Sequence, residues 1–311
     1  MSILVCGSVA YDSIMVFHDR FKNHILPDQI HILNVSFLVP DLRREFGGCA
    51  GNIAYSLKLL GSDPLIMATV GEDAGPYRYR LEKLGLSQAY VREVADSFTA
   101  QAFITTDLDD NQITAFHPGA MFHSHLNDVR EVPGVKLGIV SPDGRDGMLR
   151  HALGFAEMGV PFVFDPGQAL PILSSEELLT CLQLARYCTV NSYEASLMCE
   201  KTGRSEAELA AMVEGFVVTL GAEGSRIHCG DEVLNIPAVE AEVIVDPTGC
   251  GDAYRAGLLH GLVRGWDMLQ AARLAAVMGA FKIAHRGGQN HKPTREDIAA
   301  RYREAFGEEP W

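Results

Sequence analysis

One short stretch joins an apolar run, a glycine turn and a predicted helix. Residues 242–245 are strand-like, and the turn Gly249-Cys250-Gly251 opens a long apolar run without another break. The turn presents consecutive backbone N–H groups at the positive end of a helix dipole, which favours an anion such as phosphate. Asp252 follows, where its carboxylate can cap the helix or accept a proton from an attacking hydroxyl. The spacing alone leaves both roles open.

A second glycine-rich stretch precedes another predicted helix. Gly47 and Gly48 allow a ligand to approach the backbone closely, and the side chain of Asn52 both donates and accepts hydrogen bonds. The apolar spacing over 53–60 and the terminator Gly61 indicate the helix itself. Taken alone, this pattern fits a glycine-rich helix cap as well as a ligand site.

The composition is that of an ordinary soluble protein of 311 residues, with 47% hydrophobic and 21% charged residues. The net charge of −14 argues against nucleic acid or an anionic membrane as a partner. A nucleotide is still allowed, because a helix N-terminus and Mg²⁺ supply local positive potential. Seven cysteines without CxxC spacing indicate reduced thiols and a cytoplasmic location, and we expect no signal peptide and no membrane span.

Strand-like and helix-like segments alternate along most of the chain. This alternation predicts an α/β fold with a mostly parallel sheet and helices on both faces. The predicted strands are 3–6, 65–70, 136–140, 160–164, 187–190 and 216–220, and the predicted helices are 76–84, 146–158, 175–184 and 194–201. Several polar side chains follow strands and should meet at the carboxyl edge of the sheet. These side chains are Asp12, Asn191, Thr219 and Asp252.

Two segments interrupt the alternation. Residues 13–45 carry short β-like runs at 14–17 and 30–35, and residues 98–120 contain a hairpin pattern around the polar turn 107–111. We expect both segments to leave the main sheet and to form a second, smaller one.

Asp246-Pro-Thr-Gly-Cys-Gly-Asp252, followed by Arg255-Ala-Gly, resembles the C-terminal signature of the ribokinase-like (PfkB) sugar and nucleoside kinases. Cys250 stands where the commonest form has Ala. The stretch from Gly47 to Asn52 resembles the N-terminal glycine signature of the same family. The resemblance extends over nearly the whole chain. It implies one ribokinase-like α/β domain over 1–311, in which the two interrupting segments form a β lid over the sugar site.

The resemblance also implies an ATP-dependent phosphoryl transfer that uses Mg²⁺. Asp252 would be the general base, and the turn of Gly249, Cys250 and Gly251 would stabilise the transferring group. Residues from the first part of the chain would hold the sugar; these are Asp12, Gly47, Gly48 and Asn52.

Two further stretches resemble the nucleotide site of the family. Asn191 and Glu194 form an Asn-x-x-Glu pattern after a strand, which fits a helix cap but in the family holds phosphates and, through water, Mg²⁺. A later strand runs into a glycine turn that contributes Thr219, Gly221 and Gly224. The sequence has neither a Walker A motif nor a protein-kinase motif set.

Asp246 and Thr248, together with Gly287-Gly-Gln289, match elements that bind a monovalent cation, often K⁺, in relatives. Carbonyl ligands leave little trace in a sequence, so dependence on K⁺ is a hypothesis. Arg255 either reaches phosphate or pairs with a neighbouring carboxylate. The doublet His123-Ser-His125 has no third metal ligand at suitable spacing, which favours a solvated loop.

Three stretches together look more like the prokaryotic nucleoside kinases of the family than like ribokinases; these are Asp165-Pro-Gly-Gln168, Asp110-Asn-Gln-Ile-Thr114 and Asp246-Pro-Thr-Gly. The amide of Gln168 suits a purine edge or a ribose oxygen, or it makes a structural hydrogen bond. Phe103, Phe116 and Met121 lie in or beside the lid and either stack on a base or pack within the lid. We therefore predict phosphorylation of the ribose 5′-hydroxyl of a purine nucleoside such as adenosine, inosine or guanosine.

Two other functions stay open. A sugar or sugar-phosphate kinase of the ribokinase or fructokinase type would use the same machinery, and Arg43 and Arg44 near the lid are compatible with it. A non-catalytic nucleoside-binding regulatory protein would not need an intact Asp252 and glycine turn. Exposed strand edges in the lid also favour a homodimer through the lid.

Overall fold

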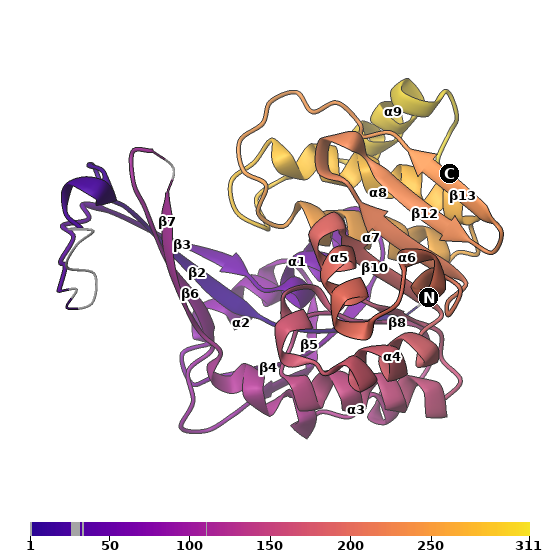
Figure 1. The fold of residues 1–311 in the computed structure, drawn as a ribbon, viewed down its shortest axis with the longest axis horizontal. Helices are drawn as coiled ribbons and strands as arrows, with labels where there is room; N and C mark the ends of the chain where they lie inside the picture. The colour runs from indigo at the N-terminus through magenta and orange to yellow at the C-terminus, as the bar shows by residue number, and fades with distance from the viewer. Residues whose placement is uncertain (1, 26–31, 33, 110) are drawn as a thin grey trace.

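The computed structural model describes residues 2–25, 32, 34–109 and 111–311. Its main sheet has nine strands: Ser2–Cys6 (β1), Pro64–Val70 (β4), Ser87–Glu93 (β5), Val135–Val140 (β8), Phe162–Phe164 (β9), Tyr187–Asn191 (β10), Gly215–Thr219 (β11), Ser225–Cys229 (β12) and Glu232–Ile236 (β13). Their order is β13-β12-β11-β10-β9-β8-β1-β4-β5. The pairings from β11 to β5 are parallel, and β12 and β13 add an antiparallel edge. The predicted mostly parallel sheet is confirmed (Figure 1).

Helices cover both faces of this sheet (Figure 1). They are Cys49–Leu59 (α1), Gly75–Lys83 (α2), Arg145–Glu157 (α3), Ser175–Leu184 (α4), Ser192–Thr202 (α5), Glu206–Ala210 (α6), Cys250–Leu262 (α7), Met268–Ile283 (α8) and Arg295–Phe306 (α9). Alternate residues of β1 point to opposite faces. Leu4 and Cys6 pack with α3 to α6, whereas Ile3 and Val5 pack with α1, α2 and α7. Within the described residues, none of the helices combines the length and the hydropathy that crossing a bilayer requires.

A second sheet of four strands projects from the main body (Figure 1). It consists of Asp41–Gly47 (β3), Ala10–Val16 (β2), Ala100–Thr106 (β6) and Gln112–His117 (β7), in that order. β2 pairs antiparallel with β3 and parallel with β6, and β6 and β7 form the predicted hairpin. We call this sheet the lid. The β-like run expected at 30–35 includes residues outside the described part of the chain.

Strand register sorts the side chains of the lid onto two faces. Asp12 is opposite Glu45 on one neighbouring strand and opposite Ala102 on the other, and Ala102 is opposite Phe116. These four residues therefore share one face, which we call the inner face because it carries Asp12. Three exposed apolar side chains lie on the opposite, outer face; these are Leu42, Phe103 and Ile113.

The strand predicted at 242–245 is wrong. This segment belongs to neither a helix nor a strand, and the side chain of Ile244 is 78% exposed. The N–H groups of Val245 and Asp246 donate to the carbonyl of Ile283, at 2.9 and 3.1 Å. The approach to α7 is therefore fixed by the end of α8 and not by a sheet.

Candidate active site

The glycine turn begins α7 as predicted, and Gly249 is its N-cap residue. Gly249 has a φ of 77°, a left-handed conformation that favours glycine. The N–H of Cys250 donates to the carbonyl of Pro247 at 3.1 Å, and within the described residues no side chain caps the turn. The start of α7 therefore has the form of an anion site.

Asp252 lies in the first turn of α7 but does not cap it. Its Oδ2 accepts a hydrogen bond from Nδ2 of Asn52 on α1, at 2.9 Å. Burial raises the pKa of Asp252, while the charge of Arg255 and hydrogen bonds from Asn52 and Cys49 oppose the rise. A raised pKa makes the carboxylate a stronger proton acceptor, which suits a general base.

A chain of hydrogen bonds fixes Asn52. Nε2 of Gln289 donates to Oδ1 of Asn52 at 3.1 Å and lies 2.7 Å from the hydroxyl of Tyr77. That hydroxyl donates to the carbonyl of Gly47 at 2.7 Å. All three side chains are buried, so the Asn52 amide has one defined orientation toward Asp252. Sequence reasoning missed Tyr77, and it placed Gln289 only in a cation loop.

Gly47 and Gly48, which precede α1, leave space that atoms of Asp12 and Ser8 occupy. A Cβ at Gly47 would lie 2.5 Å from Oδ2 of Asp12, so glycine here lets that carboxylate lie against the backbone. Gly48 has a φ of 84°, and its Cβ would lie 2.6 Å from the carbonyl oxygen of Ser8. Both glycines are therefore needed to bring the start of α1 against the first two strands.

Asp12 lies on the inner face of the lid, where the lid joins the main body. Burial raises the pKa of Asp12 to about 6, and the negative charges of Asp252, Glu45 and Asp246 add to this rise. The structure thus brings together the carboxylates of Asp12 and Asp252, which are far apart in the sequence, as the predicted convergence requires.

Arg255 pairs with a carboxylate. Its Nη2 donates to Oδ1 of Asp165 at 2.7 Å, its Nε lies beside Oδ2, and both side chains are buried. Of the two roles left open by the sequence, the ion pair is the one observed. It ties α7 to the residue that follows β9 and supplies positive charge near Asp252.

Asn191 and Glu194 form a complete capping box at the start of α5. Oδ1 of Asn191 accepts from the N–H of Glu194 at 2.8 Å, and Oε2 of Glu194 accepts from the N–H of Asn191 at 2.7 Å. The helix-capping role of this pattern is confirmed. Both residues lie at the carboxyl end of β10, next to Thr219 at the end of β11. A nucleotide role for them stays a prediction.

The two glycines after β11 differ in their surroundings. Gly221 begins a short 3₁₀ turn, Gly221–Glu223, and nothing lies within 4 Å of a Cβ built on it. Gly224 has a φ of 94°, and its Cβ would lie 2.0 Å from the carbonyl oxygen of Ile236. Gly224 is thus explained by packing at the β12–β13 edge, whereas Gly221 leaves open space for a ligand.

Gln168 lies on a 3₁₀ segment, Gly167–Ile172, that follows β9. Its side chain is exposed and makes no hydrogen bond to any described residue. The rings of His123 and His125 are 6.2 Å apart. Among the residues that the structure describes, no group of three His, Cys, Asp or Glu side chains is placed to hold a metal ion.

In the loop predicted to bind a monovalent cation, the oxygen atoms of Asp246 already accept hydrogen bonds from protein groups. The carboxylate of Asp246 accepts from the N–H groups of Thr248 and Gly287, at 2.9 and 2.8 Å. Its carbonyl accepts from Nζ of Lys282 at 2.8 Å. N–H and ammonium groups that point at these oxygen atoms do not fit a bound K⁺. Sequence reasoning missed Lys282, although a single charge inside the apolar run 274–284 was a signal for it.

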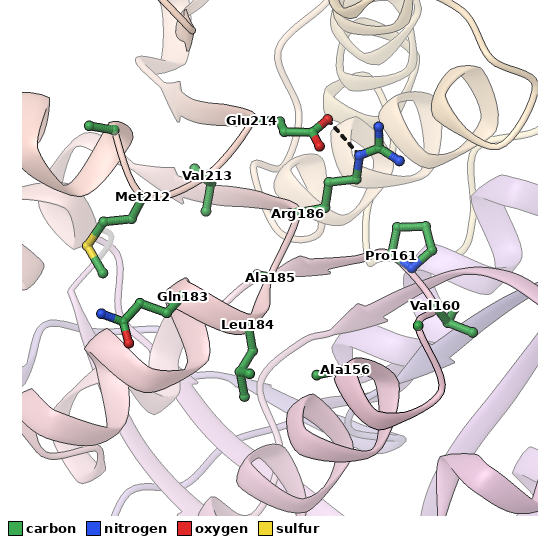
Figure 2. Close-up of a pocket in the computed structure, with 12 residues that line it drawn as sticks. Ala156, Val160, Pro161, Gln183, Leu184, Ala185, Arg186, Met212, Val213 and Glu214 are labelled. Atoms are coloured by element: carbon green, nitrogen blue, oxygen red, sulfur yellow. Dashed lines mark hydrogen bonds and ion pairs between the residues drawn. The ribbon is translucent and has the colours of Figure 1, made fainter.

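An open surface pocket lies elsewhere on the molecule (Figure 2). Its lining includes Pro161, Arg186 and Glu214, which precede β9, β10 and β11. Arg186 and Glu214 form an ion pair with Nε and Oε2 2.6 Å apart. The pocket is therefore at the amino edge of the sheet, opposite the carboxyl edge where ligands of such sheets bind.

Known proteins are similar to this chain over most of its length. The model of the pfkB family of carbohydrate kinases matches residues 8–295. The nucleoside kinase of Methanocaldococcus jannaschii is 32% identical over 273 residues, which cover 86% of this chain and 89% of that protein. The nucleoside kinase of Burkholderia thailandensis in complex with inosine has a TM-score of 0.90 at 54% identity and 99% coverage of both chains. Its complex with ADP and inosine has a TM-score of 0.88 at 56% identity, over 99% of this chain and 97% of that one.

The similarity to the family extends over the lid, both glycine motifs and every strand of the main sheet except β1, because the matched range runs from Ser8 to Arg295. The predicted ribokinase-like α/β fold with a small β lid is confirmed. The chain belongs to the pfkB family of carbohydrate kinases.

Proposed function

We propose that the protein is an ATP-dependent nucleoside kinase that phosphorylates the ribose 5′-hydroxyl of a purine nucleoside. The observation that carries this proposal is the hydrogen bond from Asn52 to Asp252 at the start of α7, with Asp12 facing the same place. The nucleoside kinases of M. jannaschii and B. thailandensis, similar to this chain over most of their length, support a nucleoside as the acceptor.

In the proposed reaction, Asp252 accepts the proton of the 5′-hydroxyl as its oxygen attacks the γ-phosphorus of ATP in line. A new P–O bond forms to the nucleoside, the bond to the β-phosphate oxygen breaks, and ADP leaves. The backbone N–H groups of Gly249 and Gly251 stabilise the negative charge on the transferring group, whereas that of Cys250 donates to the carbonyl of Pro247. Their fixed direction at the helix start means that little reorganisation is needed during transfer.

Asp12 is the proposed ribose ligand. Its two carboxylate oxygens suit the two vicinal hydroxyls of a ribose, and its carboxylate is near enough to Asp252 for the two charges to interact. Asn52 contributes its amide, and Gly47 and Gly48 hold the backbone of this region close to the sugar. Holding the ribose at its 2′ and 3′ positions leaves the 5′-hydroxyl free to point at Asp252.

The nucleotide is proposed to lie at the carboxyl ends of β10 and β11, over Asn191, Thr219 and Gly221. Mg²⁺ usually keeps several waters and takes one or two carboxylates plus phosphate oxygens, so it needs no cluster of acidic side chains. Glu194 fits such a water-mediated contact, since only its Oε2 caps α5. When bound, Mg²⁺ neutralises charge on the phosphates.

The base is proposed to lie between Gln168 and the lid. The exposed amide of Gln168 can donate to and accept from a purine edge. Phe116 is on the inner face with Asp12, so its ring can stack on the base. Phe103 is on the outer face and does not have this role. Adenosine, inosine and guanosine are the candidate substrates.

We further propose a homodimer through the outer face of the lid. Leu42, Phe103 and Ile113 have exposed fractions of 68%, 40% and 46%. A second copy of the same face would cover these apolar side chains in an isologous contact.

The test of the proposed function is ATP-to-ADP turnover with Mg²⁺ against purine nucleosides, ribose, fructose and their phosphates. Turnover confined to nucleosides would support the proposal and rank the bases. Turnover with sugars alone would keep the role of Asp252 but replace the proposed base site. Tight nucleoside binding without turnover would favour a regulatory protein.

A further inference from the structure

A lysine is buried behind the glycine turn. Lys282 lies in the last turn of α8, and its side chain is 0% exposed. Its Nζ donates to the carbonyl of Asp246 at 2.8 Å and to the carbonyl of His285 at 2.9 Å. An ammonium group is almost never fully buried unless it is paired, so this placement needs a reason.

The ammonium joins the two loops that frame the start of α7. Asp246 lies in the loop before α7, and His285 lies in the turn after α8. The same loops are bound together by the hydrogen bond from the N–H of Gly287 to the Asp246 carboxylate, at 2.8 Å. A Cβ at Gly249 would lie 3.7 Å from Cε of Lys282 and 3.0 Å from Cα of Gly288. The lysine is therefore packed directly beneath the anion turn.

Negative and polar groups surround this ammonium. The carboxylates of Asp246 and Asp252 lie near enough to favour its charged form. Burial opposes them and lowers the pKa of Lys282. Carbonyl oxygens and a carboxylate arranged around one positive charge are also the surroundings in which proteins hold K⁺. A second cation placed there would be repelled by the charge of Lys282.

We propose that the ammonium of Lys282 is a built-in monovalent cation that fixes the anion turn of α7 and makes the enzyme independent of K⁺. Lys282 acts as a positioning residue, because it contacts the loops and not the substrate. Its charge also adds positive potential behind the phosphate site. This inference rests on the proposed kinase function only where turnover is measured; the unfolding experiment below does not depend on it.

The first experiment compares turnover of the unmodified protein in potassium, sodium and tetramethylammonium buffers of equal ionic strength. The same turnover in all three is expected. Activation by K⁺ over the other two cations would overturn the proposal, and this measurement needs no variant.

The second experiment uses two substitutions of different size. Lys282→Ala leaves a space beside the two carbonyls, and a loss of about 100-fold in kcat is expected in tetramethylammonium buffer. K⁺ should restore most of that turnover by occupying the space. Lys282→Met fills the space, so its loss should persist in K⁺. Lys58→Met is the matched control, because Lys58 also ends a helix and donates to a carbonyl, that of Gly85, at 3.1 Å.

Thermal unfolding of Lys282→Ala separates this inference from the proposed function. K⁺ should raise the melting temperature of Lys282→Ala relative to tetramethylammonium, and should not do so for the unmodified protein or for Lys282→Met. A purely structural lysine would lower the melting temperature in every buffer without selective recovery in K⁺. That outcome would overturn the proposal even if no nucleoside were a substrate. Where turnover is measured, equal activity losses in all three buffers would overturn it as well.

Discussion

At the scale of single residues, the general base is the most direct point to test. Asp252→Asn keeps the size of the side chain and an oxygen for the hydrogen bond from Asn52, but it cannot accept a proton. We expect kcat to fall by roughly 10²–10⁴-fold. Nucleoside affinity, measured by calorimetry, should change little. Near-normal turnover would remove Asp252 from its proposed role, and Asp63→Asn, at an exposed carboxylate just before β4, is the control.

Asp12 links activity to pH and to stability. The pKa of Asp12 is raised to about 6, so the folded protein holds the proton of this carboxyl more tightly than the unfolded chain does. A group with a raised folded-state pKa contributes stability at low pH, and this contribution is lost as the pH rises through about 6. Asp12→Asn should therefore stabilise the protein at pH 8 by up to about 3 kcal/mol. It should also raise the KM for the nucleoside, because the charged hydrogen-bond acceptor is lost.

Denaturant unfolding at pH 8 and pH 5 checks the Asp12 prediction. The gain in the free energy of unfolding should be fully present at pH 8 and about half as large at pH 5. Asp63→Asn, at a surface carboxylate that is 86% exposed, should show neither change. A gain of equal size at both pH values would contradict the electrostatic explanation.

Sequence reasoning found residues whose role depends on neighbours in the chain and missed those whose partners are distant. Asp252 was found because the glycine turn, the helix start and the carboxylate are consecutive. Lys282 and Tyr77 were missed because their partners lie in other segments. For Arg255 two roles are compatible with the sequence, and only the position of Asp165 after β9 decides between them.

At the scale of elements, the same contrast holds. The helix predicted at 175–184 is confirmed as α4, since a capping box of Ser174 and Glu177 fixes its start locally. The strand predicted at 242–245 failed because an apolar run does not by itself find a neighbouring strand, and this one lies exposed beside the end of α8. β5, β12, β13, α8 and α9 were not predicted.

A substitution at Gly249 tests whether the conformation of the turn that begins α7 is needed for activity. Gly249→Ala places a Cβ in a left-handed conformation, which costs about 1–2 kcal/mol, and brings it within 3.0 Å of Cα of Gly288. The turn should shift and kcat should fall, while the melting temperature should decrease only modestly. Gly203→Ala at the end of α5 is the matched control, since it has a φ of 66° and no atom within 4 Å of its Cβ. Equal kcat losses in both variants would contradict a specific role of the turn.

At the scale of the whole molecule, the lid has two faces with different tasks. The inner face carries Asp12 and Phe116 toward the site, so lid closure would bring a ribose ligand and an aromatic ring together and exclude water. The outer face carries apolar side chains that no described part of the chain covers. In the proposed arrangement one sheet makes both a substrate contact and a subunit contact, and the proposed dimer would hold the lid in a defined position.

Phe103→Glu tests this arrangement, because it places a charge in the middle of the outer face. We expect a dimer for the unmodified protein and a monomer for the variant, measured by sedimentation or by light scattering after size exclusion. KM for the nucleoside should rise in the monomer, since the lid loses its support, while the chemistry at Asp252 is retained at saturating substrate. Leu153→Glu is the control: Leu153 is 49% exposed on α3, away from the lid, and a charge there should leave the dimer intact. A monomeric unmodified protein would show that the outer face does not pair with a second copy.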